Sequence, residues 1–386
     1  MEFLNNLTLE YQYVIAVSFL LLLPKILLRF RIPSGMTALG LGIICNLFLG
    51  WFENDDMITT LARLGITSLF VFAGMEIDFD DIKKNYKPIS KYLANSLAII
   101  ALTSLAVHFL VGLSIQISLI FSIAIYTPSA GFILSSLKNY ELNDEEIYWI
   151  KLKAISKEIA AIFTLFIALQ MNDMGTFFKT KLILIAIFIS LPYLFKLYLK
   201  FIAPYAPKSE VSFLVIMAFL TGVLTKKLGT HYLVGAFATG LVAGQFKHFK
   251  DSSHSLRIEN SLSTFYSIFV PFYFFSAGLL ITQSYFSFEG LFYGIILIII
   301  FVPIRFFSVL FSIKYFIDRF WQHRYRISVS LMPNLIFGLV TISILATKFN
   351  VDAAILSGLV LYTIIASLLP TLVFKKVPPE DYQLGQ

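Results

Sequence analysis

Apolar stretches of about 20 residues recur from one end of this 386-residue chain to the other. A helix of that length crosses the hydrocarbon core of a bilayer, which is about 30 Å thick. The chain is 58% hydrophobic and only 14% charged, whereas a soluble domain is about one quarter charged. Because lipid cannot satisfy backbone polar groups, such a sequence must cross the membrane as helices. We therefore expect an all-α, multi-pass integral membrane protein with the lipid bilayer as its partner.

The apolar stretches predict thirteen membrane spans. Most of the 30 lysines and arginines fall in alternate connections and in the C-terminal tail, which the positive-inside rule places in the cytoplasm. We expect the N-terminus outside, the C-terminus inside and a bacterial inner membrane as the location. The net charge of +7 then belongs to a cytoplasmic rim, and no nucleic-acid partner is expected. The predicted spans are 11–29, 33–52, 57–77, 90–112, 114–136, 146–171, 180–203, 210–228, 231–248, 261–282, 286–313, 325–347 and 353–374.

Two of these spans carry proline in their middle part, beside small or polar residues. One span contains Thr127, Pro128 and Ser129, and another contains Pro333 and Asn334. Proline removes a backbone donor and clashes with the preceding turn, so each helix is predicted to break there. An opened backbone at membrane depth is tolerated only where protein or a water-filled cavity satisfies it. Paired broken helices in two halves of a chain are the best sequence indication of a binding site in a secondary transporter.

The chain also resembles itself at an offset of about 200 residues. Gly74 matches Gly278, Gly40 matches Gly240, and the two helix-breaking prolines are separated by a similar interval. An odd number of spans separates the matching segments, so the two repeats have opposite orientations in the membrane. We expect two inverted repeats of six spans, with span 180–203 as the linker, and the two broken helices crossing each other.

Several ionisable residues lie inside the predicted spans, where such groups are costly and usually functional. Lys157 and Glu158 occupy the middle of span 146–171, and Arg305 lies in the inner half of span 286–313. Glu158 is the candidate carboxylate for binding an ion or a proton. Arg305 also has a structural interpretation, since a cation stabilises a helix C-terminus at a break. Lys151 and Lys153 are one or two turns nearer the cytoplasm and are expected at the rim, where long side chains reach water.

Five short motifs, in order along nearly the whole chain, resemble those of the monovalent cation:proton antiporter-2 family of the sodium/hydrogen exchanger superfamily. The motifs begin with the proline-containing entry to the second span and include the first unwound helix. They are Pro33-Ser-Gly35, Leu69-Phe-Val-Phe-Ala-Gly-Met-Glu-Ile-Asp78, Thr127-Pro-Ser-Ala130, Gly235-Ala-Phe-Ala-Thr-Gly240 and Phe274-Phe-Ser-Ala-Gly278.

The resemblance implies an ion site at Ser156-Lys157-Glu158. There the family has a polar or acidic residue followed by an aspartate, so Glu158 matches the aspartate while Lys157 departs from the pattern. Arg305 falls where many members carry a basic residue. Hard cations prefer oxygen ligands, so the candidates beside Glu158 are hydroxyl and amide groups near the breaks. These candidate ligands are Thr127, Ser129, Ser156 and Asn334, with Glu158 and Thr127 expected to hold the monovalent cation.

The resemblance also implies an architecture and a mechanism. Residues 1–82 and 206–284 would form a scaffold that makes a homodimer, residues 88–174 and 286–376 a transport core, and 180–203 a linker helix. Glu158 would bind either a proton or Na⁺ or K⁺, and alternating access would exchange them across the membrane. No cofactor is expected beyond the transported ions. The sequence contains no nucleophile motif, phosphate-binding loop or metal-ligand spacing that would indicate an enzyme.

Two other functions are compatible with the sequence. A sodium-coupled symporter of an organic anion would explain the excess of intramembrane cations over carboxylates. A non-transporting membrane sensor derived from an antiporter would use Lys157 as a built-in counter-ion for Glu158. Proton movement in vesicles under an imposed Na⁺ or K⁺ gradient separates these alternatives from antiport.

Overall fold

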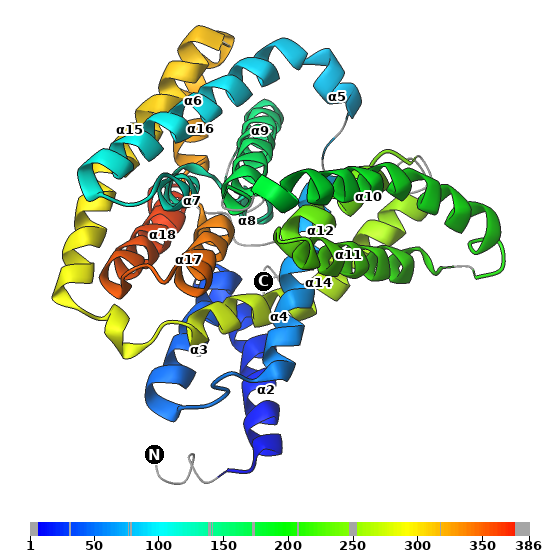
Figure 1. The fold of residues 1–386 in the computed structure, drawn as a ribbon, viewed down its shortest axis with the longest axis horizontal. Helices are drawn as coiled ribbons and strands as arrows, with labels where there is room; N and C mark the ends of the chain where they lie inside the picture. Colours follow the sequence, from blue (N-terminus) through cyan, green and yellow to red (C-terminus); the bar gives the residue numbers. More distant parts are fainter. Residues whose placement is uncertain are drawn as a thin grey trace, which may run out of the picture. The chain divides into compact units, whose positions relative to one another are not determined.

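The computed structural model of the chain describes residues 7–30, 32–75, 77, 79–137, 140, 142–171, 174–206, 208–246, 253–316 and 318–374. The described backbone is almost entirely helical, as predicted (Figure 1). Seven of its helices are long and apolar enough to cross a membrane, and one bent pair makes an eighth if it forms a single span. Every predicted span falls on a helix or on two helical segments divided by a break, although the count of thirteen crossings stays a prediction.

The described residues form two compact units. The first comprises Met1–Asn54, Tyr86–Leu165 and Phe274–Gln386. Within it α15 packs on α18, and α7 packs on both α6 and α17, as the adjacent teal and orange ribbons in Figure 1 illustrate. Its elements are α2 (Leu9–Leu28), α3 (Ser34–Ile44) with the π-helical turn η1 (Cys45–Leu49), α6 (Tyr86–Val111), α7 (Ile115–Tyr126), α8 (Ala130–Leu137), most of α9 (Asp144–Leu169), η2 (Gln283–Tyr285), α15 (Phe288–Phe316), η3 (Asp318–His323), α16 (Arg324–Ser330), α17 (Leu335–Phe349) and α18 (Ala353–Val373).

The second unit comprises Asp55–Asn85 and Phe166–Tyr273. Within it α12 packs against both α4 and α11. Its elements are α4 (Asp56–Met75), α5 (Phe79–Lys84), α10 (Met174–Phe201), α11 (Glu210–Lys227), α12 (Tyr232–Ala243) and most of α14 (Ser253–Leu279), whose last residues belong to the first unit. The predicted division into scaffold and transport core stays a prediction.

Glycines of the sequence motifs lie where two helix backbones meet. A Cβ atom on Gly240 of α12 would lie 2.1 Å from the carbonyl oxygen of Val71 in α4, and one on Gly74 would lie 2.4 Å from that of Phe237. Small residues at these positions allow helices to approach closely, which is how membrane helices associate. The motif residues Glu76 and Asp78 lie outside the described residues.

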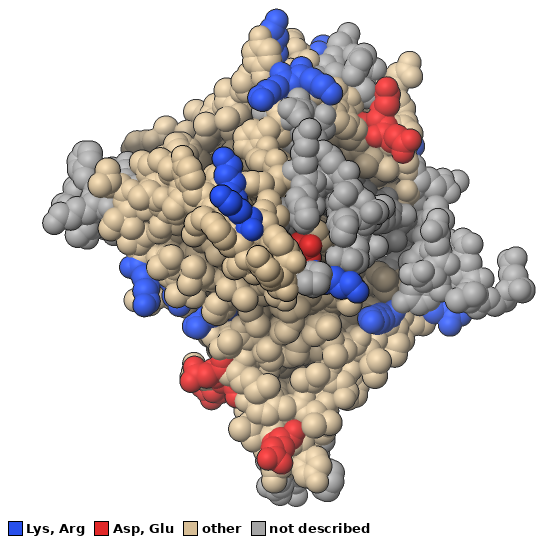
Figure 2. Space-filling model, turned by 90° about the vertical axis from the view of Figure 1, so that its right-hand side faces the viewer, with Lys and Arg blue, Asp and Glu red and all other residues tan. Residues whose placement is uncertain are grey.

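The exterior of the described helices is apolar. Leu182 of α10 is 73% exposed and Phe292 of α15 is 61% exposed. Figure 2 shows one face of the molecule, on which charged side chains form small separate groups among uncharged residues. Large exposed apolar surface of this kind is typical of a protein surrounded by lipid. The prediction of an integral, multi-pass membrane protein is therefore confirmed.

Substitution of Gly240 by alanine should destabilise the fold, because the added methyl group overlaps the Val71 carbonyl oxygen. We expect a loss of about 1–3 kcal/mol, the usual cost of overpacking. Gly40 of α3 is the matched control, since a Cβ there meets nothing within 4 Å. Thermal unfolding in detergent should show a lower midpoint for Gly240→Ala and an unchanged or higher one for Gly40→Ala. Equal midpoints would contradict this account of the packing.

Candidate functional site

Two helices are broken at the predicted prolines, and the breaks are in contact. One break separates α7, which ends at Tyr126, from α8, which begins at Ala130. The other separates α16 from α17, and the chain bends there by 44°. The Ser129 backbone N–H donates a hydrogen bond to the Pro333 carbonyl oxygen at 2.9 Å. Residues about 200 positions apart in sequence therefore lie side by side.

Proline removes the backbone donor that the end of α7 would use, and the other break replaces it. The Ala124 carbonyl would accept from residue 128, which is proline and has no N–H. The Asn334 side-chain amide donates to that carbonyl instead, at 2.7 Å. In a continuous helix the Ile125 carbonyl would accept from the Ser129 N–H, which here donates to Pro333. The Ile125 carbonyl accepts instead from the Tyr362 hydroxyl at 3.1 Å.

The start of α17 is capped in the reverse direction. The Ser129 hydroxyl oxygen accepts from the backbone N–H groups of Ile336 at 2.9 Å and Phe337 at 3.2 Å. Asn334 directly precedes α17, so its backbone N–H makes no hydrogen bond within that helix. It donates instead to the Ser367 hydroxyl at 3.2 Å. Each break thus supplies the hydrogen-bonding partners that the other has lost, and an apolar interior requires this.

Arg305 connects the two breaks. Its guanidinium is fully buried and donates from Nη1 to the Tyr362 hydroxyl at 3.0 Å and from Nη2 to the Leu331 carbonyl at 3.1 Å. Leu331 directly follows α16, so the positive charge lies at a helix C-terminus, where it is favourable. This contact agrees with the structural interpretation of Arg305, which was one of the two that its sequence position allowed. Tyr362 and Ser367 were not predicted from the sequence, because one hydroxyl group in an apolar helix forms no pattern.

A small polar cavity lies beside the first break. The centre of a water-sized sphere can occupy about 10 Å³ of this cavity, which is about the space that one water molecule needs. The Thr127 side chain is 1% exposed, and its hydroxyl has no hydrogen-bond partner among the described residues. Lys157 lines the same cavity and lies within electrostatic range of Arg305. The lining residues are Ser96, Ile99, Ile100, Tyr126, Thr127 and Lys157.

The other residues of the predicted ion site are buried on α9. Glu158 is 3% exposed and directly follows Lys157, and Ser156 is 2% exposed with its hydroxyl donating to the Leu152 carbonyl at 2.7 Å. A buried carboxylate is costly unless hydrogen bonds or opposite charges compensate it, which makes Glu158 a candidate functional group. The Asn334 side-chain carbonyl oxygen is also buried and has no hydrogen-bond partner in the described part of the chain.

Lys153 differs from the expectation that it would lie at the rim. It is 2% exposed, and its ammonium donates to the Ser312 hydroxyl of α15 at 2.6 Å and lies 4.7 Å from the ring centre of Tyr92 in α6. Depth along a span does not determine which face of the helix a residue occupies. Lys153 faces other helices, so its side chain cannot follow the surface to water. Lys151 is half-buried.

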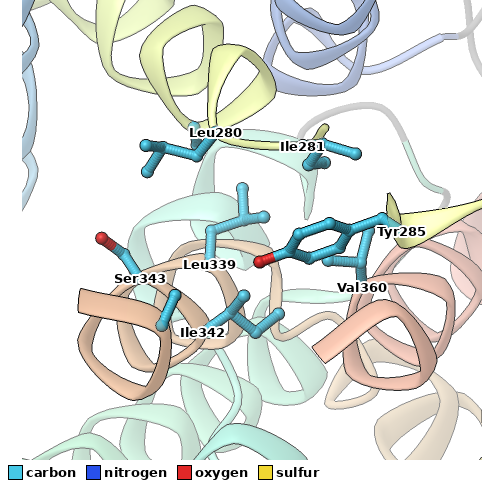
Figure 3. Close-up of a pocket in the computed structure, with 9 residues that line it drawn as sticks. Leu280, Ile281, Tyr285, Leu339, Ile342, Ser343 and Val360 are labelled. Carbon is cyan, nitrogen blue, oxygen red and sulfur yellow. The ribbon is translucent and has the colours of Figure 1, made fainter. Parts of the chain in front are cut away.

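A second cavity lies elsewhere in the same unit, and it is apolar. Its volume by the same measure is about 20 Å³, and Leu280, Ile281, Leu339 and Ile342 face it together with the hydroxyl groups of Tyr285 and Ser343 (Figure 3). No charged side chain lines it, whereas Lys157 lines the cavity at the helix break. The polar cavity at the helix break is therefore the candidate site.

Paired broken helices with buried charges beside them are typical of a secondary transporter. The chain belongs to the sodium/hydrogen exchanger family, whose transmembrane domain matches residues 15–376. It is 22% identical over 276 residues to the probable Na⁺/H⁺ antiporter 3 of Methanocaldococcus jannaschii, covering 70% of this chain and 71% of that one. It is 23% identical over 298 residues to the Na⁺/H⁺-K⁺ antiporter GerN of Bacillus cereus, covering 71% and 73%. The resemblance found in the sequence motifs is confirmed.

The fold is also similar to that of a solved antiporter. The structure of the sodium proton antiporter MjNhaP1 from Methanocaldococcus jannaschii at pH 8 superimposes with a TM-score of 0.67 over 95% of both chains. The two sequences are 14% identical, so this likeness concerns the fold alone.

Ser129→Ala should destabilise the crossing, because it leaves the Ile336 and Phe337 N–H groups without their acceptor. The loss of buried partners should cost about 1–3 kcal/mol. Ser190→Ala is the matched control, since that exposed hydroxyl only donates to a carbonyl of its own helix. Thermal unfolding of the two purified variants measures the difference. A Ser129→Ala midpoint as high as that of the control would rule out the proposed capping.

Proposed function

We propose that the chain exchanges a monovalent cation, Na⁺ or K⁺, for protons across the membrane by alternating access. The main support for the proposal is the polar cavity at a helix break, which is lined by Thr127 and Lys157. The buried Glu158 directly follows Lys157 in the chain. The antiporter names of the relatives support the same reaction class. The chain would thus act as a transporter and not as an enzyme, with no cofactor besides the transported ions.

In the proposed mechanism Glu158 binds either a proton or the cation, and never both together. Several buried oxygen atoms near the breaks have no hydrogen-bond partner among the described residues, Ser330 Oγ at the end of α16 being one of them. Thr127 Oγ1 and Asn334 Oδ1 are two others. We assign them as cation ligands because hard cations prefer oxygen. The Ser156 hydroxyl donates a hydrogen bond to the Leu152 carbonyl, which leaves the lone pairs of its oxygen available. Ser156 is therefore a further candidate cation ligand. Ser129 already accepts two N–H groups, and we assign it a supporting role.

The remaining parts of the predicted architecture belong to this proposal. They are the thirteen spans, the inverted repeats, the scaffold and core bundles, the homodimer, the bacterial inner membrane and the outside N-terminus. Two kinds of contact support inverted repeats. Gly42 of α3 meets the end of α14, and Gly240 of α12 meets α4, so the matching helices make matching contacts. Ser129 and Asn334, which follow the two prolines, exchange hydrogen bonds with each other's helices.

A sodium-coupled symporter of an organic anion is the second candidate. Three buried or half-buried cations, Lys153, Lys157 and Arg305, lie in the same compact unit as Glu158. Proteoliposomes distinguish the candidates: an imposed Na⁺ or K⁺ gradient should move protons in the opposite direction without any organic anion. Cation flux that requires an added anion would favour symport, and the absence of any flux would favour a sensor.

Glu158→Gln should abolish cation-driven proton movement, because glutamine neither releases a proton nor neutralises a bound cation. The fold should persist, since glutamine is nearly isosteric and avoids burying a charge. Fluorescence of a pH-sensitive dye inside proteoliposomes measures the exchange, and thermal unfolding checks the fold. Glu145→Gln, an exposed carboxylate at the start of the same helix, is the control and should retain exchange. Exchange by Glu158→Gln at the wild-type rate would remove Glu158 from the mechanism.

Lys157→Asn should shift the pH profile of exchange toward alkaline pH. Loss of a neighbouring positive charge favours the protonated form of the carboxyl group, so proton release then requires higher pH. The rate of exchange measured from pH 6 to pH 9 tests the shift. Lys151→Asn, two turns away and half-buried, should leave the profile in place. An unaltered Lys157→Asn profile would mean that this ammonium does not act on Glu158.

A further inference from the structure

Tyr362 is a buried polar residue that no motif indicated and that the proposed mechanism has not used. It lies on α18, is fully buried, and has its hydroxyl between two groups of the site. The hydroxyl accepts from Arg305 Nη1 at 3.0 Å and donates to the Ile125 carbonyl at 3.1 Å. A phenol inside a helical bundle needs both a donor and an acceptor, and here the two breaks provide them.

The Tyr362 hydroxyl completes a continuous series of hydrogen bonds from one break to the other. The series runs from the Leu331 carbonyl, after α16, through the Arg305 guanidinium and the Tyr362 hydroxyl to the Ile125 carbonyl in the last turn of α7. A charged donor polarises the phenol and strengthens the bond that the phenol donates. The Arg305 guanidinium therefore holds the C-terminus of α16 directly and the C-terminus of α7 through Tyr362.

The segment held in this way forms the wall of the polar cavity. Ile125 is followed by Tyr126 and Thr127, which both line the cavity, and the helix ends between them. Thr127 itself keeps only its backbone bond to the Ile123 carbonyl, while its hydroxyl has no partner in the described residues. A small displacement of the α7 terminus would therefore move the Thr127 hydroxyl, which makes no hydrogen bond of its own to the described residues that would restrain it.

We propose that Tyr362 is a positioning residue for cation binding, which acts by holding Thr127 in place as a ligand. This inference rests on the proposed exchange function. Tyr362 touches neither cation nor proton carrier in the proposed cycle; it preorganises one ligand through the backbone. Loose ligands weaken binding because the cation must order them on arrival. Removal of the hydroxyl should therefore act on cation affinity more than on turnover.

The test is Tyr362→Phe, which removes the hydroxyl and keeps the ring. Cation-driven proton movement in proteoliposomes should show an apparent KM for Na⁺ or K⁺ raised about three- to tenfold, the effect of one buried hydrogen bond, with the maximal rate changed less. Tyr198→Phe on α10 is the control, because it also removes a hydrogen-bonded hydroxyl, here one paired with the Ser209 hydroxyl in the other compact unit. Its apparent KM should equal that of the wild type.

A double-mutant cycle with Thr127→Val shows whether Tyr362 acts through Thr127. If it does, Tyr362→Phe should add nothing to the KM of the Thr127→Val protein. An unchanged KM for Tyr362→Phe, additive effects in the cycle, or an equal KM for Thr127→Val and the wild type would each overturn the proposal. A lower rate with constant KM would also overturn it and would indicate a purely structural role. Wild-type protein without cation-driven proton movement would instead refute the proposed exchange function.

Discussion

The structure depends on the need to satisfy backbone groups that proline leaves open in an apolar interior. Pro128 and Pro333 interrupt their helices in a buried interior, where protein groups replace most of the lost hydrogen bonds. The Asn334 amide substitutes for the N–H that Pro128 lacks, and the Ser129 hydroxyl caps the helix that begins after Pro333. Each break thus supplies hydrogen-bonding partners to the other, and the two segments lie in contact at this point.

The same constraint explains why buried charge gathers around the crossing. A carbonyl at a helix C-terminus is a natural partner for a cation, and Arg305 occupies that position after α16. Its charge-assisted bond to Tyr362 extends the arrangement to the end of α7. The Lys153 ammonium instead donates to the Ser312 hydroxyl and lies over the face of the Tyr92 ring. A cation–π contact stabilises a charge more strongly in a buried position such as this than at an exposed one. Structural support and the candidate ion site therefore share one place and some of the same residues.

Buried oxygen atoms without hydrogen-bond partners are a feature of the candidate site. Many polar groups at the breaks are matched by a donor or an acceptor, but Thr127 Oγ1 and Asn334 Oδ1, like Ser330 Oγ and Arg305 Nε, have no partner among the described residues. Buried groups of this kind usually await a ligand or a water molecule, since leaving them empty costs free energy. The cavity beside Thr127 has room for one such guest. Membership of the sodium/hydrogen exchanger family makes a monovalent cation the natural choice.

Hydropathy, proline positions and short motifs were sufficient to predict the helices, their breaks and the family from the amino-acid sequence. Hydrophobicity and length are sufficient to locate helices in a chain that must satisfy its backbone internally, so predicted spans and observed helices agree, for example 353–374 with Ala353–Val373. Proline chemistry located both breaks, and the motifs identified the family. The contacts between side chains of different helices could not be predicted from the sequence and are known from the folded structure. Tyr362 and Ser367 became partners of the breaks, and Lys153 became buried, because these outcomes depend on how each helix is rotated against its neighbours. In helices apolar on every side the sequence carries no periodic signal for that rotation.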